Sequence, residues 1–471
     1  TGDFDPGHAG LEIITVVGTK SLQGTRHSTV QVLHADGSAL DNGAWPYRVP
    51  EVPLDPLRDL QAATLADIDL DGALDLIVYL HKKLHILNFA GDNIANAFLQ
   101  GYGFQVTSGG KLIAAGELDG DPLPELVHGE FDLALDESSL YVWDLEDVEP
   151  GLLIEMGDLM AGLQEDPPDL YRLEHLTLAD LDEDPQLELV LLLANKMQVD
   201  PWSYKTRDYT LVGLNSHGNG EWSLAGGEWP VLLDETGTIA LFPDSMVFVV
   251  PADLDLDGAP ELIASTRNTI NIRRADGSPY LDHALPGMVF ESSPVVADIS
   301  GGGFHPEIIA NSLFSSIFAW DHLGSAIGGF PMATINPIIG APAVGDVDGD
   351  GDKEVVVRDV PLMPFFGDPS WIYVFDGGGS GPDPWPMVRG CPEATNAQPV
   401  PSTPAPERGD ANEDGEIDIG DVAFLATFLF LAGPAPSDLD LLDTNSDTQI
   451  DIADIVFLLA YLFNGGPAPA P

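Results

Sequence analysis

Two acidic stretches near the C-terminal end of the chain, starting at Asp410 and Asp443, repeat one pattern of oxygen-bearing side chains. Side-chain oxygens fall at loop positions 1, 3, 5, 9 and 12, and position 7 offers its backbone carbonyl. The positions are filled by Asp410, Asn412, Asp414, Glu416, Asp418 and Asp421 in the first stretch and by Asp443, Asn445, Asp447, Gln449, Asp451 and Asp454 in the second. Calcium takes six to eight oxygen ligands at about 2.4 Å. The pattern therefore predicts two calcium-binding loops rather than two acidic turns that only cap helices.

The two loops differ at position 6, where the chain turns sharply. Gly415 occupies this position in the first loop and Thr448 in the second. Because a left-handed backbone conformation is unfavourable for a β-branched residue, we expect the second loop to be more strained and to bind calcium more weakly.

An apolar segment follows each loop, over 422–431 and 455–463, and each segment is followed by a Gly-Pro-Ala-Pro sequence. These features predict two helices that end at Gly and Pro. Residues 408–466 thereby resemble a type I dockerin, a small calcium-dependent module that binds a cohesin. The resemblance implies a docking role, with recognition residues at loop positions 10 and 11, which are Ile419, Gly420, Ile452 and Ala453.

The two predicted helices are apolar around almost their whole circumference, which is typical of helices that are buried on several sides. The helices could use these side chains in packing on each other. Because large exposed apolar patches usually mark interaction sites, we expect some of them to contact a protein partner. The expected contact residues are Phe424, Phe428, Phe457 and Tyr461.

A related acidic pattern recurs seven times upstream, with an acid, further acids two and four residues on, and another acid eight residues on. Five copies keep all four acids. They are Asp67, Asp69, Asp71 and Asp75; Glu117, Asp119, Asp121 and Glu125; Asp180, Asp182, Asp184 and Glu188; Asp253, Asp255, Asp257 and Glu261; and Asp346, Asp348, Asp350 and Glu354. The copies that start at Asp3 and Asp298 are degraded, and Ser300 replaces an acid in the latter. We expect altered or empty metal sites in these two.

Each acidic loop precedes a short β-branched strand and a second β-rich segment, such as 30–37 or 270–277, that ends in a turn. Strands that alternate with Asp-Gly turns predict antiparallel meanders. One meander of about 50 residues cannot bury both faces, but several can do so when they are arranged around an axis.

Residues 1–390 resemble an FG-GAP or VCBS-type calcium β-propeller of the kind found in integrin α chains. The resemblance implies an all-β, seven-bladed propeller in which each calcium loop joins the first two strands of a blade, with the carbonyl of Ala73 as an additional ligand. The first blade lacks a strand before its loop. The Pro-rich segment 391–407 is either a stiff linker or a strand that closes the ring through residues 398–404, and 408–471 form a small all-α dockerin-like domain.

Composition restricts the possible partners. The chain has 76 acidic and 18 basic residues and a net charge of −58, which excludes nucleic acid and anionic membranes as binding partners. The single cysteine, Cys391, excludes an intrachain disulfide, and no apolar run reaches the length of a membrane span. A start at Thr1 without a leader suits a mature secreted protein, and we expect it to be bacterial.

The sequence contains no zinc motif, nucleophile elbow or phosphate loop. We therefore predict an extracellular binding or assembly protein that is stabilised by several structural Ca²⁺ ions and performs no catalysis. Its dockerin-like domain would bind a cohesin-like partner or a neighbouring subunit, in the latter case with a possible head-to-tail filament. Two alternatives remain: a carbohydrate-binding lectin, and a polysaccharide lyase that uses the cluster formed by Tyr79, His81, Lys82, Lys83 and His85.

Overall fold

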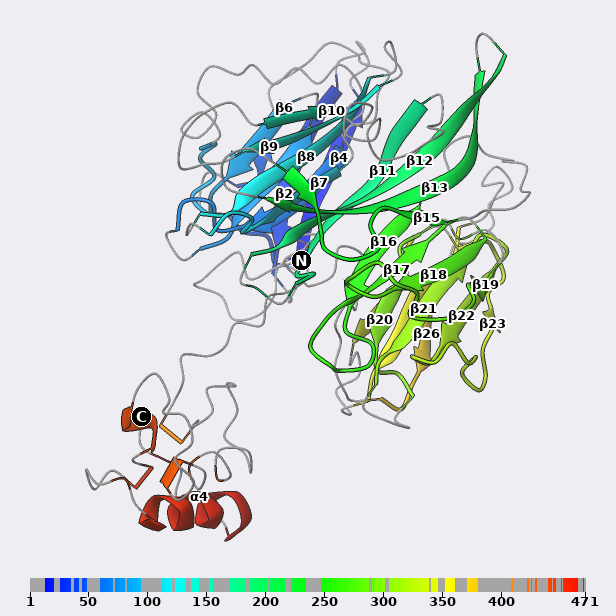
Figure 1. Cartoon of the computed structure of the whole chain (residues 1–471). Helices are drawn as coiled ribbons and strands as arrows, with labels where there is room; N and C mark the ends of the chain where they lie inside the picture. Colours follow the sequence, from blue (N-terminus) through cyan, green and yellow to red (C-terminus); the bar gives the residue numbers. More distant parts are fainter. Residues whose placement is uncertain are drawn as a thin grey trace. The chain divides into compact units, whose positions relative to one another are not determined.

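The computed structural model divides the chain into two compact units, Thr1–Gln398 and Pro399–Pro471 (Figure 1). The division falls within the Pro-rich segment 391–407. The structure describes residues 13–20, 26–34, 38–41, 45–48, 60–70, 73–80, 83–94, 112–120, 123–132, 137–143, 152–155, 170–182, 184, 186–200, 203–216, 222–233, 247–266, 268–287, 290, 292–300, 305–338, 340–345, 352–360, 371–379, 408, 409, 422, 425, 428, 429, 439–442, 444, 445, 450, 452–464 and 469.

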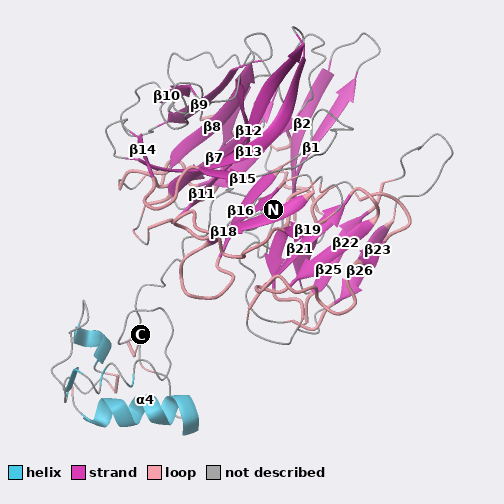
Figure 2. Ribbon diagram, turned by 45° about the vertical axis from the view of Figure 1, so that its right-hand side comes forward, coloured by secondary structure: helices cyan, strands magenta, loops and turns pink. Residues whose placement is uncertain are grey.

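The described strands of the first unit form seven small antiparallel sheets, which we number in chain order (Figure 2). The first sheet contains β1 (Ile13–Lys20), β2 (Arg26–Leu33) and β3 (Tyr47–Arg48), and the second contains β4 (Leu60–Ala66), β5 (Asp75–Leu80) and β6 (Lys83–Leu87). The third contains β7 (Leu112–Gly116), β8 (Glu125–Asp132), β9 (Glu137–Trp143) and β10 (Leu152–Glu155). The fourth contains β11 (Leu170–Ala179), β12 (Glu188–Asp200), β13 (Ser203–Ser216), β14 (Trp222–Leu224) and β15 (Val231–Leu233).

The last three sheets are also built from antiparallel strands that are consecutive in the chain. The fifth contains β16 (Phe248–Ala252), β17 (Glu261–Ser265), β18 (Thr269–Arg273) and β19 (Leu285–Pro286), and the sixth contains β20 (Val295–Ala297), β21 (Glu307–Ser312), β22 (Ser316–Trp320) and β23 (Met332–Ala333). The seventh contains β24 (Ala343–Gly345), β25 (Glu354–Arg358) and β26 (Ile372–Asp376). The meanders predicted from the sequence are confirmed at this level, and so are the strands that follow the acidic loops.

The central strands of the second to sixth sheets are apolar on both faces because each of these sheets lies between two others. In β17, for example, Leu262 and Ala264 belong to the core with the fourth sheet, whereas Ile263 between them belongs to the core with the sixth. Successive side chains of a strand point to opposite faces, so a continuous apolar run serves two interfaces at once.

Six apolar cores join the seven sheets, each between two sheets that are consecutive in the chain. Representative pairs across them are Val30 and Val78, Ile77 and Ile113, Val127 and Leu189, Leu192 and Val249, Ile263 and Val296, and Ile309 and Val355. Within the described residues, no core joins the seventh sheet to the first, and no sheet closes on itself.

Two buried tryptophans connect one sheet to the next, a feature that the sequence analysis missed. Trp45, which precedes β3, donates its indole N–H to the carbonyl of Phe89 at 2.8 Å, and Trp229, which precedes β15, donates to the carbonyl of Ala275 at 3.2 Å. Beside Trp229, Gly227 has φ 109°, and a Cβ there would lie 2.2 Å from the carbonyl oxygen of Asp276. The signal in the sequence is the Trp-Pro dipeptide, which occurs at both positions.

We expect Trp229→Ala to destabilise the first unit by about 3–5 kcal/mol, because it removes a large buried side chain and leaves a cavity between two sheets. Urea unfolding of the two variants provides the measurement. Trp371→Ala is the matched control, since Trp371 is half-exposed and its replacement should change the unfolding free energy by less than about 0.5 kcal/mol. Equal losses for both variants would show that the indole of Trp229 does not join the sheets.

The second unit contains α4 (Ile452–Asn464) and the short 3₁₀-helix η2 (Leu439–Leu442), and Val422, Leu425, Phe428 and Leu429 are also helical. The fully buried side chains of Leu425, Leu442 and Leu458 form its core. The second predicted helix is confirmed, but it begins at Ile452 rather than at Ile455. Asp454 lies in its first turn, where a carboxylate is favourable because it faces the positive end of the helix dipole. Among the described residues, none of the helices has the length and apolar character needed to cross a membrane.

Candidate metal centres

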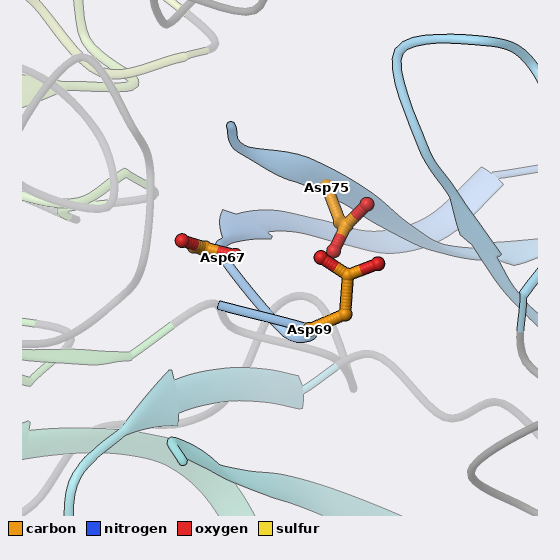
Figure 3. A group of neighbouring side chains, drawn as sticks. All are labelled: Asp67, Asp69 and Asp75. Atoms are coloured by element: carbon orange, nitrogen blue, oxygen red, sulfur yellow. The ribbon is translucent and has the colours of Figure 1, made fainter. Parts of the chain in front are cut away.

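Four groups of three carboxylates converge in the first unit, each in the loop between the first two strands of a sheet. We call these loops two (67–75), three (117–125), four (180–188) and five (253–261). The groups are Asp67, Asp69 and Asp75; Glu117, Asp119 and Glu125; Asp180, Asp182 and Glu188; and Asp253, Asp255 and Glu261. In each group, one carboxylate oxygen per residue lies within 4.8 Å of the others. Figure 3 shows the group of loop two, in which the carboxylates of Asp69 and Asp75 point toward each other.

The last acid of each group is the first residue of the following strand and is held in the same way each time. Its carboxylate is buried and accepts a backbone N–H from loop position 2. The donors are Ile68 to Asp75 at 3.1 Å, Leu118 to Glu125 at 2.6 Å, Leu181 to Glu188 at 2.6 Å, and Leu254 to Glu261 at 2.9 Å. The donor residues are themselves buried in the cores between the sheets, so the apolar residue at position 2 anchors the loop.

Loop position 4 takes a left-handed conformation in three of these loops. The φ angle is 55° at Leu70, 94° at Gly120 and 59° at Leu256. For leucine this conformation costs roughly 1–2 kcal/mol. The loops therefore hold a tight turn that brings like charges together at some energetic cost.

Burial and neighbouring charges disfavour ionisation of the last acids of loops four and five. Burial raises the pKa of Glu188 from 4.5 to about 8, against the lowering effect of the Leu181 N–H, and Asp182, Asp184 and Asp180 raise it further. Burial likewise raises the pKa of Glu261 to about 8, the Leu254 N–H opposes this, and Asp255, Asp253 and Asp257 add to it. A proton or a cation can relieve this repulsion, and a group of carboxylates matches the hard-oxygen preference of calcium.

This electrostatic arrangement predicts a pH dependence of stability in the calcium-free protein. The unfolded chain releases these protons near pH 4.5, but the folded chain retains them until about pH 8. The contribution to stability is therefore full below pH 4.5 and is lost as the pH rises toward 8. Urea midpoints in EDTA at pH 5 and pH 8 provide the measurement.

The double variant Glu188→Gln, Glu261→Gln tests the cause of that pH dependence, because an amide has no proton to lose in this range. We expect its midpoint to fall less between pH 5 and pH 8 than that of the unchanged protein. The low pKa values of Asp276 and Asp359 do not interfere, because both groups are ionised throughout this window. An identical fall in the double variant would refute the assignment to these two carboxylates.

The remaining predicted ligands of the first unit have different outcomes. Asp184 and Asp257 lie in loops four and five, where each carboxylate accepts an N–H two residues on, from Gln186 at 2.8 Å and from Ala259 at 3.0 Å. Glu354 is buried at the start of β25, the same place as the last acids above. The ligand role of the Ala73 carbonyl stays a prediction. Asp71, Asp121, Asp346, Asp348 and Asp350 lie outside the described residues.

The degraded loop 298–307 keeps the hydrogen bond from position 2 to its last acid but replaces one carboxylate by a hydroxyl. Glu307 accepts the N–H of Ile299 at 2.7 Å, and the Ser300 hydroxyl donates to its other oxygen. Ser300 occupies loop position 3, at which loops two to five have their second carboxylate. The predicted alteration of this site therefore has a chemical basis, whereas the loop from Asp3 lies outside the described residues.

In the second unit, two predicted ligands of the second loop lie together. Asp454 is fully buried, and its Oδ1 accepts the N–H of Asn445 at 3.2 Å. The hydroxyl of Thr444 donates to the carbonyl of Asp454 at 2.9 Å, and the N–H of Gly409 donates to the carbonyl of Leu441 at 2.9 Å. The other predicted loop residues lie outside the described part of this unit: Asp410, Asn412, Asp414, Glu416, Asp418, Asp421, Asp443, Asp447, Gln449 and Asp451.

The predicted partner contacts in the second unit divide into exposed and half-buried residues. Ile452 is 61% exposed and Ala453 is also exposed, whereas Phe428, Phe457 and Tyr461 are half-buried. Val456, one helical turn beyond Ile452, is 59% exposed and was missed by the sequence analysis. Ile419, Gly420 and Phe424 lie outside the described residues.

The histidine cluster considered for a lyase does not present His85 as an exposed base. His85 is buried, and its Nδ1 lies 2.9 Å from Nδ2 of Asn93 and 3.5 Å from the hydroxyl of Tyr47. The side chains of Tyr79 and Lys83, and residues His81 and Lys82, lie outside the described part of the molecule.

Comparison with known proteins identifies the second unit. Residues 408–463 match the family model of the dockerin type I domain. Domains of this class bind calcium and pair with a protein partner, typically a cohesin, and the proteins that carry them are typically extracellular and bacterial. None of the curated proteins matches the chain.

Two solved structures show only a distant similarity. A crystal structure of BBS1N in complex with ARL6DN, soaked with lead, has 10% sequence identity and a TM-score of 0.41, and the match covers 69% of this chain and 88% of that chain. The V. cholerae biofilm matrix protein Bap1 has 12% identity and a TM-score of 0.31, with 82% of this chain and 74% of that chain covered. These likenesses are too distant to assign a fold or a function.

Proposed function

We propose that the chain is an extracellular, calcium-stabilised assembly protein whose dockerin domain attaches a rigid β scaffold to a cohesin-like partner. The dockerin match over 408–463 is the observation that carries this proposal. It is supported by the hydrogen bond that the backbone N–H of Asn445, at loop position 3, donates to the carboxylate of Asp454, at loop position 12. Calcium between such residues would fix the start of α4 against the loop.

The surface offered to the partner is the exposed N-terminal part of α4. Ile452 and Val456 lie four residues apart on the helix, so their side chains form one apolar stripe, and the small Ala453 lies beside it. A stripe of this kind can insert into an apolar groove of a partner. In this proposal the contact includes Ile419 and Gly420, as the resemblance implies. It also includes Phe424, Phe428, Phe457 and Tyr461, because the two predicted helices are apolar around almost their whole circumference.

For the first unit we propose structural calcium in loops two to five and in the equivalent loop 346–354. The carboxylates of loops two to five converge, and a divalent ion would relieve their mutual repulsion. Because four carboxylates and a carbonyl leave little open coordination for a substrate, the ions would stabilise the loops rather than take part in catalysis.

We propose further that residues 1–390 form a seven-bladed propeller, with 391–407 as linker or closing strand and 408–471 as the docking domain. Seven consecutive sheets with six cores support this arrangement. The outward face of the seventh sheet carries exposed Ile372 and Val374, which would pack on the first sheet. No described strand pairs with the second edge of β1, where residues 398–404 would add the missing strand.

The test is capture of a partner by the full chain from the native extracellular fraction, with calcium and with EDTA. We expect a cohesin-containing protein to be retained in calcium and released by EDTA. If the retained protein is a second copy of this chain, the module joins neighbouring subunits instead. Retention of the same partner in both conditions would contradict a calcium-dependent docking function.

A further inference from the structure

Four sheets contain an equivalent turn after their second or third strand. The residue that opens this turn differs in charge from sheet to sheet. Its N–H donates to the carbonyl four residues on in each case: His34 to Ser38 at 2.9 Å, Asn88 to Asp92 at 3.1 Å, Arg274 to Ser278 at 2.9 Å, and Asp321 to Ser325 at 2.9 Å. At this position the fifth sheet has an arginine, where the second has an asparagine and the sixth an aspartate.

The guanidinium of Arg274 lies beside the carboxylates of loop five. Its Nη1 is 3.7 Å from Asp255 Oδ2 and 3.8 Å from Glu261 Oε1. The same group lies over the ring of Tyr280, with 4.8 Å between Cζ and the ring centroid. The side chain of Arg274 is 44% exposed and that of Glu261 only 2%. The stacking on Tyr280 fixes the cation at the edge of the loop without burying it.

We propose that Arg274 is a built-in counter-ion that sets the calcium affinity of loop five. This inference rests on the proposed function of loop five as a calcium site. A fixed positive charge next to two of the three carboxylates relieves part of their repulsion when no ion is bound. The same charge repels a divalent cation that binds to those carboxylates. The arginine therefore stabilises the calcium-free loop and weakens calcium binding to it.

The expected size of this effect follows from Coulomb's law. At the dielectric constant of bulk water, a single charge about 6 Å from a divalent ion changes the binding constant by about tenfold. Screening by salt at physiological ionic strength reduces this factor to about threefold. Loop five should thus release calcium at a higher free calcium concentration than it would without Arg274.

Hydrogen exchange measured by mass spectrometry on the full chain resolves the loops individually, with calcium itself as the probe. For peptides that cover 248–265, we expect the calcium midpoint of protection in Arg274→Asn to shift to a concentration about three- to tenfold lower. In EDTA the same peptides should exchange faster than in the unchanged protein. Peptides from loops two to four are the internal control, and their midpoints should not move.

Two further variants separate charge from packing. Arg274→Lys keeps the charge and should keep the midpoint of the unchanged protein. Asn88→Arg places the cation at the equivalent turn of the second sheet and should raise the midpoint of peptides over 60–80. An unchanged midpoint in Arg274→Asn, or a lysine variant that behaves like the asparagine variant, would overturn the proposal. If calcium protects none of these peptides in the unchanged protein, then the proposed calcium function of the loop fails instead.

Discussion

Chelation of calcium should lower the melting temperature of the full chain by about 10 °C or more. Each site that is occupied at 100 times its dissociation constant contributes about 2.7 kcal/mol, so four sites contribute roughly 10 kcal/mol. One kcal/mol of unfolding free energy corresponds to a shift in melting temperature of about 2–4 °C in domains of 150–250 residues, and to a smaller shift in larger domains. Because the carboxylates of loops two to five converge within 4.8 Å, repulsion between them returns when the ions leave.

Scanning calorimetry in calcium, in EDTA and in EDTA with calcium restored in excess provides the measurement. The third condition is the control, because recovery shows that the chelator acts through the metal. Asp253→Ala should reduce the effect of EDTA by removing one site from the calcium-loaded protein. If the melting temperature were the same with and without calcium, the acidic loops would not be metal sites.

The acidic loops are the part of the molecule that the sequence predicts best, because their geometry is local. Carboxylates at alternating positions, followed by Asp75 or Glu188 at the start of a strand, lie within one short turn. The apolar residue between the first two acids, such as Leu181 or Leu254, is equally visible in the sequence. Its role became clear only when the structure placed it in a core between two sheets.

Contacts between residues that are distant in the chain could not be predicted from the sequence pattern. Trp229 meets the carbonyl of Ala275, and Arg274 lies beside Asp255 across a turn and a strand. Neither contact is encoded by a spacing. The length of β12 and β13 was also not predicted. β12 extends to Asp200, and β13 begins at Ser203 and pairs with it. Their shared sheet with β11, β14 and β15 is set by nonlocal pairing.

The start and rotation of α4 in the second unit likewise could not be predicted from the sequence. Its apolar residues predicted a helix buried on several sides, and Leu458 is indeed fully buried. However, the start at Ile452 places loop positions 10 to 12 inside the helix. This start turns Ile452 and Val456 to solvent, because the buried Asp454 is tied to Thr444 and Asn445 and so fixes the rotation of the first turn.

Replacement of Asp410 and Asp443 together by alanine should abolish capture of the partner, with at least a hundredfold loss of affinity, while the first unit stays folded. Both residues open a predicted calcium loop, and in small modules the free energy of metal binding is folding free energy. The first unit has its own six cores and should keep its melting transition. Surface plasmon resonance with the captured partner, together with calorimetry of the same samples, provides both measurements.

Two controls distinguish the role of the predicted calcium loops in binding from the role of the exposed apolar stripe of α4. Asp67→Ala removes a carboxylate of the first unit and should leave the affinity for the partner unchanged. Ile452→Asp with Val456→Asp leaves every predicted loop ligand in place but puts charge on the exposed stripe of α4, and it should reduce binding as strongly as loss of the loops. Calcium would then act by holding α4 in position and the stripe would make the contact. Full binding by the Asp410, Asp443 double variant would show instead that the partner recognises a surface that needs no calcium.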